Sequence, residues 1–289
     1  MLSTRRTGLL GRARREKAAR TPRIIVCAAL LLITTTVVAQ QFQQFRGFRG
    51  PVHTGLPPEH NGGFMFCRLE YLSVRREAGG QGWTTDYPNA DQNFMTRLSQ
   101  LTATQVSRWS EDVNGFTTVT ALDPLMFRCP FLFASDVGTA TFSEKEATNL
   151  RQYLLKGGFL WVDDFWGEQA WRQWLGELQL IMPGYRMIDI GPGHPLFSIF
   201  YQVPEVPQIP SINFWRRSGG GVSERGPESA QPEMRALVDE KGSILVLMSH
   251  DTDIADGWER EAEDPDFFYL FTARAYGMGI NVALWAMSH

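Results

Sequence analysis

A strand–helix–strand pattern between residues 131 and 165 constrains the fold of this chain more than any other stretch. Residues 131–137 and 159–162 are short apolar runs, which is typical of strands buried on both faces of a sheet. Between them, Ser143 and Glu146 have the spacing of a capping box and predict the start of a helix. Two strands joined by one helix over about 35 residues predict a βαβ unit, and therefore a parallel sheet and an α/β fold.

Titratable side chains follow the most apolar predicted strands: Asp136, then Asp163 and Asp164, then His250, Asp251 and Asp253. The carboxyl ends of parallel strands share one edge of the sheet, where open α/β proteins bind their ligands. We therefore predict a ligand site at this edge. Crowded carboxylates raise one another's pKa, and a divalent cation such as Mg²⁺ or Ca²⁺ relieves that repulsion and activates water.

The predicted metal ligands are Asp136, Asp163, Asp164 and His250, and a divalent cation is the one candidate cofactor. Capping of the helix that begins near Trp166 is the alternative role for Asp163 or Asp164.

A second candidate ligand-binding segment lies upstream, at Asp86, Tyr87 and Asp91. Several glycines precede it, and an aromatic residue in a glycine-rich loop is typical of a segment that closes on a ligand. Because the first turn of the next predicted helix has free N–H groups, capping by Asp86 or Asp91 is the alternative.

The amino-terminal stretch has the form of a leader. Residues 1–39 contain eight basic side chains and one acidic side chain, and residues 24–38 are apolar or threonine throughout. This pattern predicts a signal peptide cleaved after Ala39, with a retained membrane anchor as the alternative. Residues 40–63 are rich in Gln, Gly and Pro and predict a flexible linker. We expect a protein that is exported, either periplasmic or membrane-anchored facing the periplasm, with its domain at residues 64–289.

Charge, cysteine content and missing motifs exclude several classes of function. Residues 40–289 carry 20 basic and 30 acidic side chains, a formal charge of −10, which argues against nucleic acid. Cys67 and Cys129 are each flanked by apolar residues, so we expect buried free thiols rather than a disulfide. The sequence contains no P-loop, Gly-x-Ser-x-Gly or His-Glu-x-x-His motif.

Further elements are predicted from apolar patterning: strands at 64–72, 117–122, 187–190, 211–215 and 243–249, and a final helix at 267–288 that contains Gly277 and Gly279. The two glycines weaken that helix and predict close packing or a break there.

Several motifs occur in an order that resembles known families. SEKEATNLRQYLLKGGFLWVDD followed by GHPLF resembles the class I glutamine amidotransferase-like superfamily, in its trehalose-utilisation-like branch. The body, from FMFCRLEY through TDYPNAD to YGMGINVALWAMSH, is similar to the bacterial domain-of-unknown-function family 4159. The resemblance implies a three-layer, flavodoxin-like α/β sandwich with a mostly parallel sheet, usually exported or attached to membrane proteins. It implies no established activity.

The amidotransferases carry a reactive Cys in a tight strand-to-helix elbow, with His and Glu partners. Neither Cys67 nor Cys129 has that setting, so glutamine hydrolysis is not expected. We therefore expect an exported, non-catalytic domain that binds a small molecule or a membrane-associated protein at the carboxyl edge of its sheet. The alternative is a metal-assisted hydrolase acting on sugar or cell-wall substrates.

Overall fold

The structure is a computed structural model that describes residues 53–57 and 62–289. The predicted leader, residues 1–39, and most of the predicted linker, residues 40–63, lie outside the described residues. Within the described part of the linker, the backbone N–H of His53 donates to the Tyr87 hydroxyl, and its carbonyl accepts a hydrogen bond from the N–H of Thr118. Residues 53–57 therefore contact the domain.

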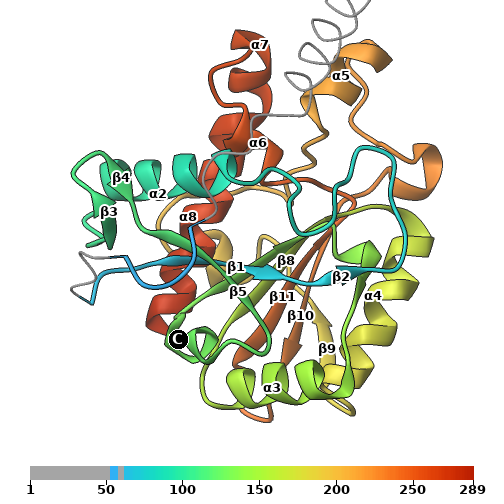
Figure 1. The fold of residues 1–289 in the computed structure, drawn as a ribbon. Coiled ribbons are helices and arrows are strands. Elements are labelled where there is room, and N and C mark those ends of the chain that lie inside the picture. Colours follow the sequence, from blue (N-terminus) through green and yellow to red (C-terminus); the bar gives the residue numbers. More distant parts are fainter. Residues whose placement is uncertain (1–52, 58–61) are drawn as a thin grey trace, which may run out of the picture. The chain divides into compact units, whose positions relative to one another are not determined.

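A seven-stranded sheet forms the centre of the domain, in the order β5-β1-β6-β8-β11-β10-β9 (Figure 1). The strands are β1 (Phe66–Glu70), β5 (Phe116–Thr120), β6 (Leu132–Ser135), β8 (Leu160–Phe165), β9 (Arg186–Asp189), β10 (Glu233–Val238) and β11 (Ile244–His250). All pairs from β5 to β11 are parallel, whereas β10 is antiparallel to both β11 and β9. Numbered along the chain, the five parallel strands have the order 2-1-3-4-5, which is the flavodoxin-like order.

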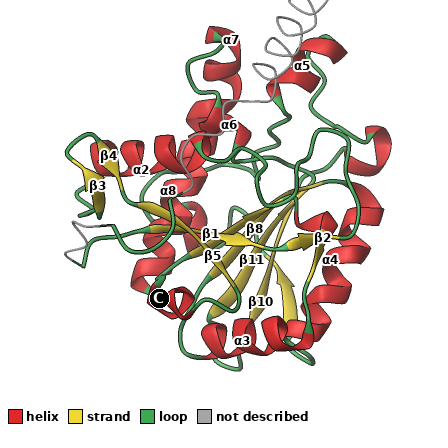
Figure 2. Ribbon diagram, viewed as in Figure 1, coloured by secondary structure: helices red, strands yellow, loops and turns green. Residues whose placement is uncertain are grey.

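Helices cover both faces of the sheet, giving a three-layer α/β sandwich (Figure 2). The main helices are α2 (Asn89–Leu101), α3 (Glu144–Leu155), α4 (Gly167–Ile181) and α8 (Ala273–Ser288). The α2 and α8 helices pack on one face, and α3 and α4 pack on the other. The predicted capping box of α3 is confirmed, because Ser143 and Glu146 exchange both of its hydrogen bonds. The predicted fold class is also confirmed.

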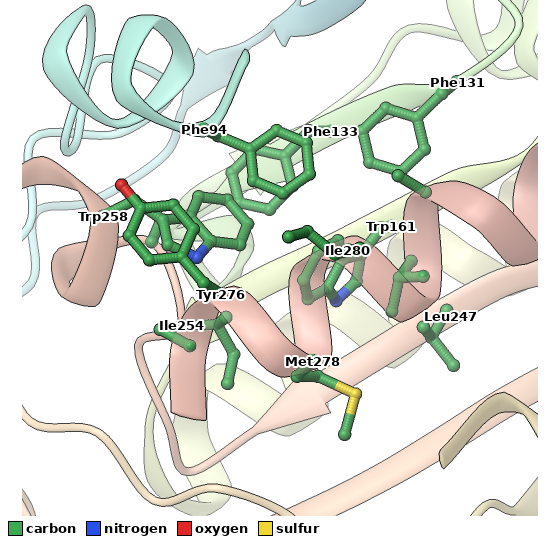
Figure 3. Close-up of a cluster of buried hydrophobic side chains, with 14 of the residues drawn as sticks. Phe94, Phe131, Phe133, Trp161, Leu247, Ile254, Trp258, Tyr276, Met278 and Ile280 are labelled. Atoms are coloured by element: carbon green, nitrogen blue, oxygen red, sulfur yellow. The ribbon is translucent and has the colours of Figure 1, made fainter. Parts of the chain in front are cut away.

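Aromatic side chains dominate the core between the sheet and the pair α2 and α8 (Figure 3). Phe133 and Trp161 come from neighbouring strands, Phe94 from α2, and Trp258 from the short helix α6 (Asp256–Glu259). The rings of Phe94 and Trp258 have centroids 4.6 Å apart. Because α6 begins directly after the carboxyl edge of the sheet, this packing fixes the position of the loop that precedes it.

The final helical segment runs from α7 (Pro265–Phe267) through a π-helical turn, Phe268–Thr272, into α8. The close packing predicted at its glycines is found at Gly279, where an added Cβ would lie 2.4 Å from the Trp258 ring. Across the described ranges, the chain forms no helix with the length and apolar character needed to cross a membrane.

Two sequence predictions are wrong. Cys67 and Cys129 form a disulfide with 6.0 Å between their Cα atoms. They meet because β1 and β6 are sheet neighbours, although 62 residues separate the two cysteines along the chain. Residues 211–215 are not a strand but begin α5 (Ile212–Ser218), because the Ser211 hydroxyl accepts a hydrogen bond from the N–H of Phe214 and caps a helix. In addition, β10 was not predicted.

Candidate functional site

A polar cavity of about 130 Å³ opens at the carboxyl edge of the parallel strands. Its lining includes eight carboxylates and three arginines: Glu77, Asp86, Asp136, Asp164, Glu224, Asp253, Asp256 and Glu259, with Arg217, Arg225 and Arg260. The β1 and β6 strands mark the point where the strand order reverses, which is where ligands bind in doubly wound folds. The loops after β1, β6, β8 and β11 all contribute to the cavity, so the fold itself gathers these side chains.

Asp136 follows β6 and is held by the loop that comes after β1. The backbone N–H of Gly82 donates to its carboxylate over 2.7 Å. The backbone at Gly80 passes so close that an added Cβ would lie 2.3 Å from Asp136 Oδ2. A residue with a side chain at position 80 would therefore displace the carboxylate, and this glycine is needed for the loop to close over Asp136.

Three buried carboxylates converge beside Asp136. Asp86, Asp253 and Asp256 each offer an oxygen, and these oxygens all lie within 4.8 Å of one another. The three residues come from the loop before α2, the loop after β11 and the first turn of α6. That spacing matches oxygen atoms that share one hard cation at 2.0–2.6 Å. In the described part of the chain, this is the one group of three or more such ligands found.

Few neutralising groups reach these three carboxylates. Asp253 accepts a hydrogen bond from the N–H of Asp256, and Asp256 accepts one from the N–H of Ile212. The Ser135 hydroxyl donates to Asp86 over 3.3 Å. Arg260 Nε lies 3.7 Å from Asp256. The negative charge of the group is therefore only partly compensated by protein groups.

Burial and mutual repulsion change the acidity of this cluster. Burial, with the nearby charges of Glu259 and Asp256, raises the pKa of Asp86 well above its usual range. Burial and the charges of Asp164 and Asp86 do the same to the pKa of Asp253. Burial raises the pKa of Asp256 to about 7 and that of Asp136 also to about 7. At neutral pH these groups compete for protons, and a bound cation would replace those protons.

Backbone conformation also distinguishes the site. Asp86, Asp136, Asp164 and Asp251 are the described non-glycine residues with positive φ, between 53° and 62°. Three of them follow or lie at the ends of the neighbouring strands β6, β8 and β11. The left-handed region costs most side chains about 1 kcal/mol or more, although Asp tolerates it better than most. Such outliers are concentrated at functional sites in proteins.

A buried arginine positions the loop that carries Asp86. Arg68 lies on β1, is fully buried, and pairs with Asp91 in the first turn of α2. Its remaining N–H groups donate to the carbonyl oxygens of Trp83 and Thr85. Asp86 follows directly, so Arg68 fixes the entry of this carboxylate into the cavity.

The structure brings Asp86, Asp136, Asp164 and Asp253 together around one cavity. Asp163 does not line it: one carboxylate oxygen accepts the N–H of Ala255, and the other is buried without a hydrogen-bond partner among the described residues.

His250 and Asp251 lie on the side of the sheet edge that faces α4. His250 Nε2 is 3.2 Å from the carbonyl oxygen of Gly167, and Nδ1 is 3.4 Å from both Glu233 and Asp251. Asp251 accepts the N–H of Gly167 over 2.7 Å at the start of α4. The free N–H at this helix start is therefore satisfied by Asp251, and not by Asp163 or Asp164.

Asp91 and Tyr87 lie outside the cavity. Asp91 forms the buried ion pair with Arg68, and Tyr87 contacts His53. At the start of α2, Pro88 stands at the N-cap position and makes no side-chain cap bond. The backbone carbonyl of Asp86 accepts the N–H of Ala90 there.

The residues predicted from the sequence do not include four carboxylates and the three arginines of the cavity: Glu77, Glu224, Asp256 and Glu259, with Arg217, Arg225 and Arg260. Asp256 lies in the acidic stretch after β11, away from any predicted strand end, and Glu224 lies in a glycine-rich surface stretch. Glu224 accepts the N–H of Ser211, and Arg225 pairs with Glu77 across the cavity. The sequence does contain a signal for Asp256, because four acidic residues lie within residues 251–259. One helix start needs fewer carboxylates for capping, so the excess indicates a site.

A family model for a domain of unknown function matches residues 66–287, from the first residue of β1 almost to the end of α8. The chain belongs to the DUF4159 family. The family predicted from the sequence motifs is therefore confirmed, and the matched residues coincide with the three-layer fold described above. No curated protein matches the chain at a significant level.

Proposed function

We propose that this DUF4159 domain binds a divalent cation at Asp86, Asp253 and Asp256, and uses it to hold a small polar ligand. The supporting observation is the convergence of three buried carboxylates, whose oxygens lie within 4.8 Å of one another. The lining of the cavity carries five more carboxylates than arginines. Since like charges in a buried site are costly, a cation is the partner that this charge distribution favours.

The donor atoms indicate the kind of cation. All three candidate ligands are carboxylate oxygens, which suit Mg²⁺, Ca²⁺ or Mn²⁺ better than the softer metals bound by Cys and His. Hard cations take six or more oxygens, so three carboxylates leave positions for other oxygen donors. The cavity of about 130 Å³ has space for roughly four water molecules or one small hydroxylated group. A ligand with hydroxyl or carbonyl oxygens, such as a sugar, fits these requirements.

We propose a binding role without catalysis as the primary function. Cys67 and Cys129 are joined in a disulfide, so neither supplies the thiolate that amidotransferases require. The 2-1-3-4-5 strand order supports a place for the family within the glutamine amidotransferase-like superfamily. A buried disulfide is typical of oxidising compartments, and it supports export to the periplasm. The leader pattern of residues 1–39 supports the same location.

Metal-assisted hydrolysis of a sugar or cell-wall substrate is the second candidate. One observation favours it: Asp136 lines the same cavity, and burial raises its pKa to about 7. A carboxyl group with a pKa near neutrality can accept a proton from water or return it to a leaving group. Release of sugar from a glycan substrate in the presence of cation, lost in Asp136→Asn, would support hydrolysis over binding alone.

Cation binding is tested by thermal unfolding of the full chain with and without Mg²⁺, Ca²⁺ or Mn²⁺, after treatment with a chelator. A cation at a hundred times its Kd stabilises the native state by about 2.7 kcal/mol. We expect an increase in Tm for the wild-type protein and none for Asp253→Asn. Asp112→Asn changes an exposed carboxylate in the turn between β3 (Arg108–Ser110) and β4 (Val113–Asn114), and serves as the matched control.

Two results would contradict the proposal. The first is the absence of any shift with all three cations. The second is an equal shift in wild-type protein and Asp253→Asn, which would place the bound cation elsewhere.

A further inference from the structure

We infer a second ligand site, separate from the acidic cavity, that binds a small apolar molecule with one anionic end. A cavity of about 520 Å³ lies between the carboxyl-terminal half of α2, the π-helical turn, α8 and residues 201–207. Sites for small molecules commonly have volumes of 300–1,000 Å³ and mostly apolar walls. The cavity shares no lining residue with the acidic cavity.

The walls of this cavity are largely apolar and partly exposed to water. Its lining residues include Tyr201, Val203, Phe268 and Leu101. Phe268 is 37% exposed and Leu101 is 45% exposed. Phe268 begins the π-helical turn, and such turns occur frequently at functional sites. An apolar molecule in this cavity would cover exposed apolar side chains. Removing their surface from water would favour binding.

Gly277 lines the cavity and leaves space open in it. Gly277 lies inside α8, where glycine costs about 0.5–1 kcal/mol relative to alanine. Packing requires glycine at position 279, because an added Cβ would lie 2.4 Å from Trp258. At position 277 the nearest atoms to an added Cβ belong to Val203 and Tyr201, at 3.7 and 3.9 Å, which is ordinary contact. A larger side chain at 277 would instead occupy the cavity, so the glycine preserves space for a ligand.

Charge at the rim indicates the polar end of that ligand. Arg97 and Arg274 line the cavity with one glutamate, Glu205, and each arginine is paired with a carboxylate, Arg97 with Glu261 and Arg274 with Glu205. Arg97 is held by two hydrogen bonds to Glu261. Arg274 makes one bond to Glu205, and both side chains are about 60% exposed, so that pair contributes little stability. Arg274 can therefore turn to an anionic group on a ligand.

The dye 8-anilinonaphthalene-1-sulfonate has this chemistry, an aromatic body and one sulfonate, and it becomes fluorescent in apolar sites. We expect saturable binding to one site on the full chain. Gly277→Leu should weaken binding by about tenfold or more, which corresponds to about 1.4 kcal/mol. Arg274→Gln should weaken it by about threefold, the scale of an exposed ion pair.

Three variants complete the test. Gly277→Ala adds one methyl group in ordinary contact and should retain binding. Gly176→Leu makes the leucine substitution at an exposed glycine of α4 with open space around it, and should also retain binding. If Gly277→Leu does not fold by circular dichroism, Leu101→Trp fills the cavity from α2 and should weaken binding similarly.

Equal affinity in wild-type protein and the cavity-filling variants would overturn the proposal. Sedimentation velocity tests the other occupant, a second copy of the chain. A wild-type dimer that Gly277→Leu converts to monomer would assign the surface to self-association and would also overturn the proposal.

Discussion

Replacement of Asp163 by Asn should remove the contribution of one buried carboxyl group to the pH dependence of stability. Asp163 is fully buried beneath the loop that carries Asp253, and one of its oxygens has no hydrogen-bond partner among the described residues. Burial raises its pKa to about 8, although backbone N–H groups such as that of Ala255 oppose the shift. In the unfolded chain the pKa returns to about 4.

The difference between the folded and unfolded pKa of Asp163 sets how the free energy of unfolding changes with pH. Between about pH 4 and about pH 8 the folded protein holds a proton at Asp163 that the unfolded chain has lost, so the free energy of unfolding falls as pH rises. One proton corresponds to about 1.4 kcal/mol per pH unit, or at most about 4 kcal/mol between pH 5 and pH 8. Asn is neutral throughout and its amide oxygen can still accept the N–H of Ala255.

Urea unfolding at about pH 5 and about pH 8, with a chelator present, provides the measurement. We expect wild-type protein and Asp163→Asn to have similar stability at the lower pH, and the variant to be more stable by a few kcal/mol at the higher pH. Asp112→Asn should follow wild type. A difference between wild type and Asp163→Asn that does not change with pH would refute the assignment of a proton to this carboxyl group.

Three further predictions concern the fold. Replacement of both Cys67 and Cys129 by Ala opens a loop with a sequence separation of 62 and should lower the free energy of unfolding in urea by about 4 kcal/mol. Asp91→Asn leaves the buried guanidinium of Arg68 uncompensated and should cost about 3–5 kcal/mol in the same assay; a loss below 1 kcal/mol would argue against the buried pair. Gly279→Ala places a methyl group 2.4 Å from a buried indole and should lower the unfolding free energy by about 1–3 kcal/mol, as measured by thermal melts.

The sequence predicted the architecture well where local signals were strong. The βαβ unit lies within a few residues of its expected bounds, because the apolar runs and the capping box agree, and Gly157 and Gly158 follow the end of α3. The strand prediction for residues 211–215 was wrong because Ile212, Phe214 and Trp215 favour strands. The cap at Ser211 instead stabilises the start of a helix. A segment this short has too few residues for periodicity to distinguish the two.

Long-range pairings account for the remaining differences. The disulfide depends on β1 and β6 being neighbours, and a strand order of 2-1-3-4-5 cannot be read from Cys67 and Cys129 alone. In the candidate site, too, some residues can be predicted from local sequence and others depend on long-range folding. The strand-end position of Asp136 and Asp164 is evident from the sequence, but the approach of Asp256 depends on how the loop after β11 folds back.

Diffraction from crystals soaked in Mn²⁺, with anomalous data collected at the manganese edge, is the most direct test of a cation bound by Asp86, Asp253 and Asp256. We expect an anomalous peak about 2–2.6 Å from carboxylate oxygens of Asp86, Asp253 and Asp256. Crystals of Asp253→Asn should show no such peak. A wild-type crystal at saturating Mn²⁺ with no peak between these three carboxylates would contradict the proposed cation site.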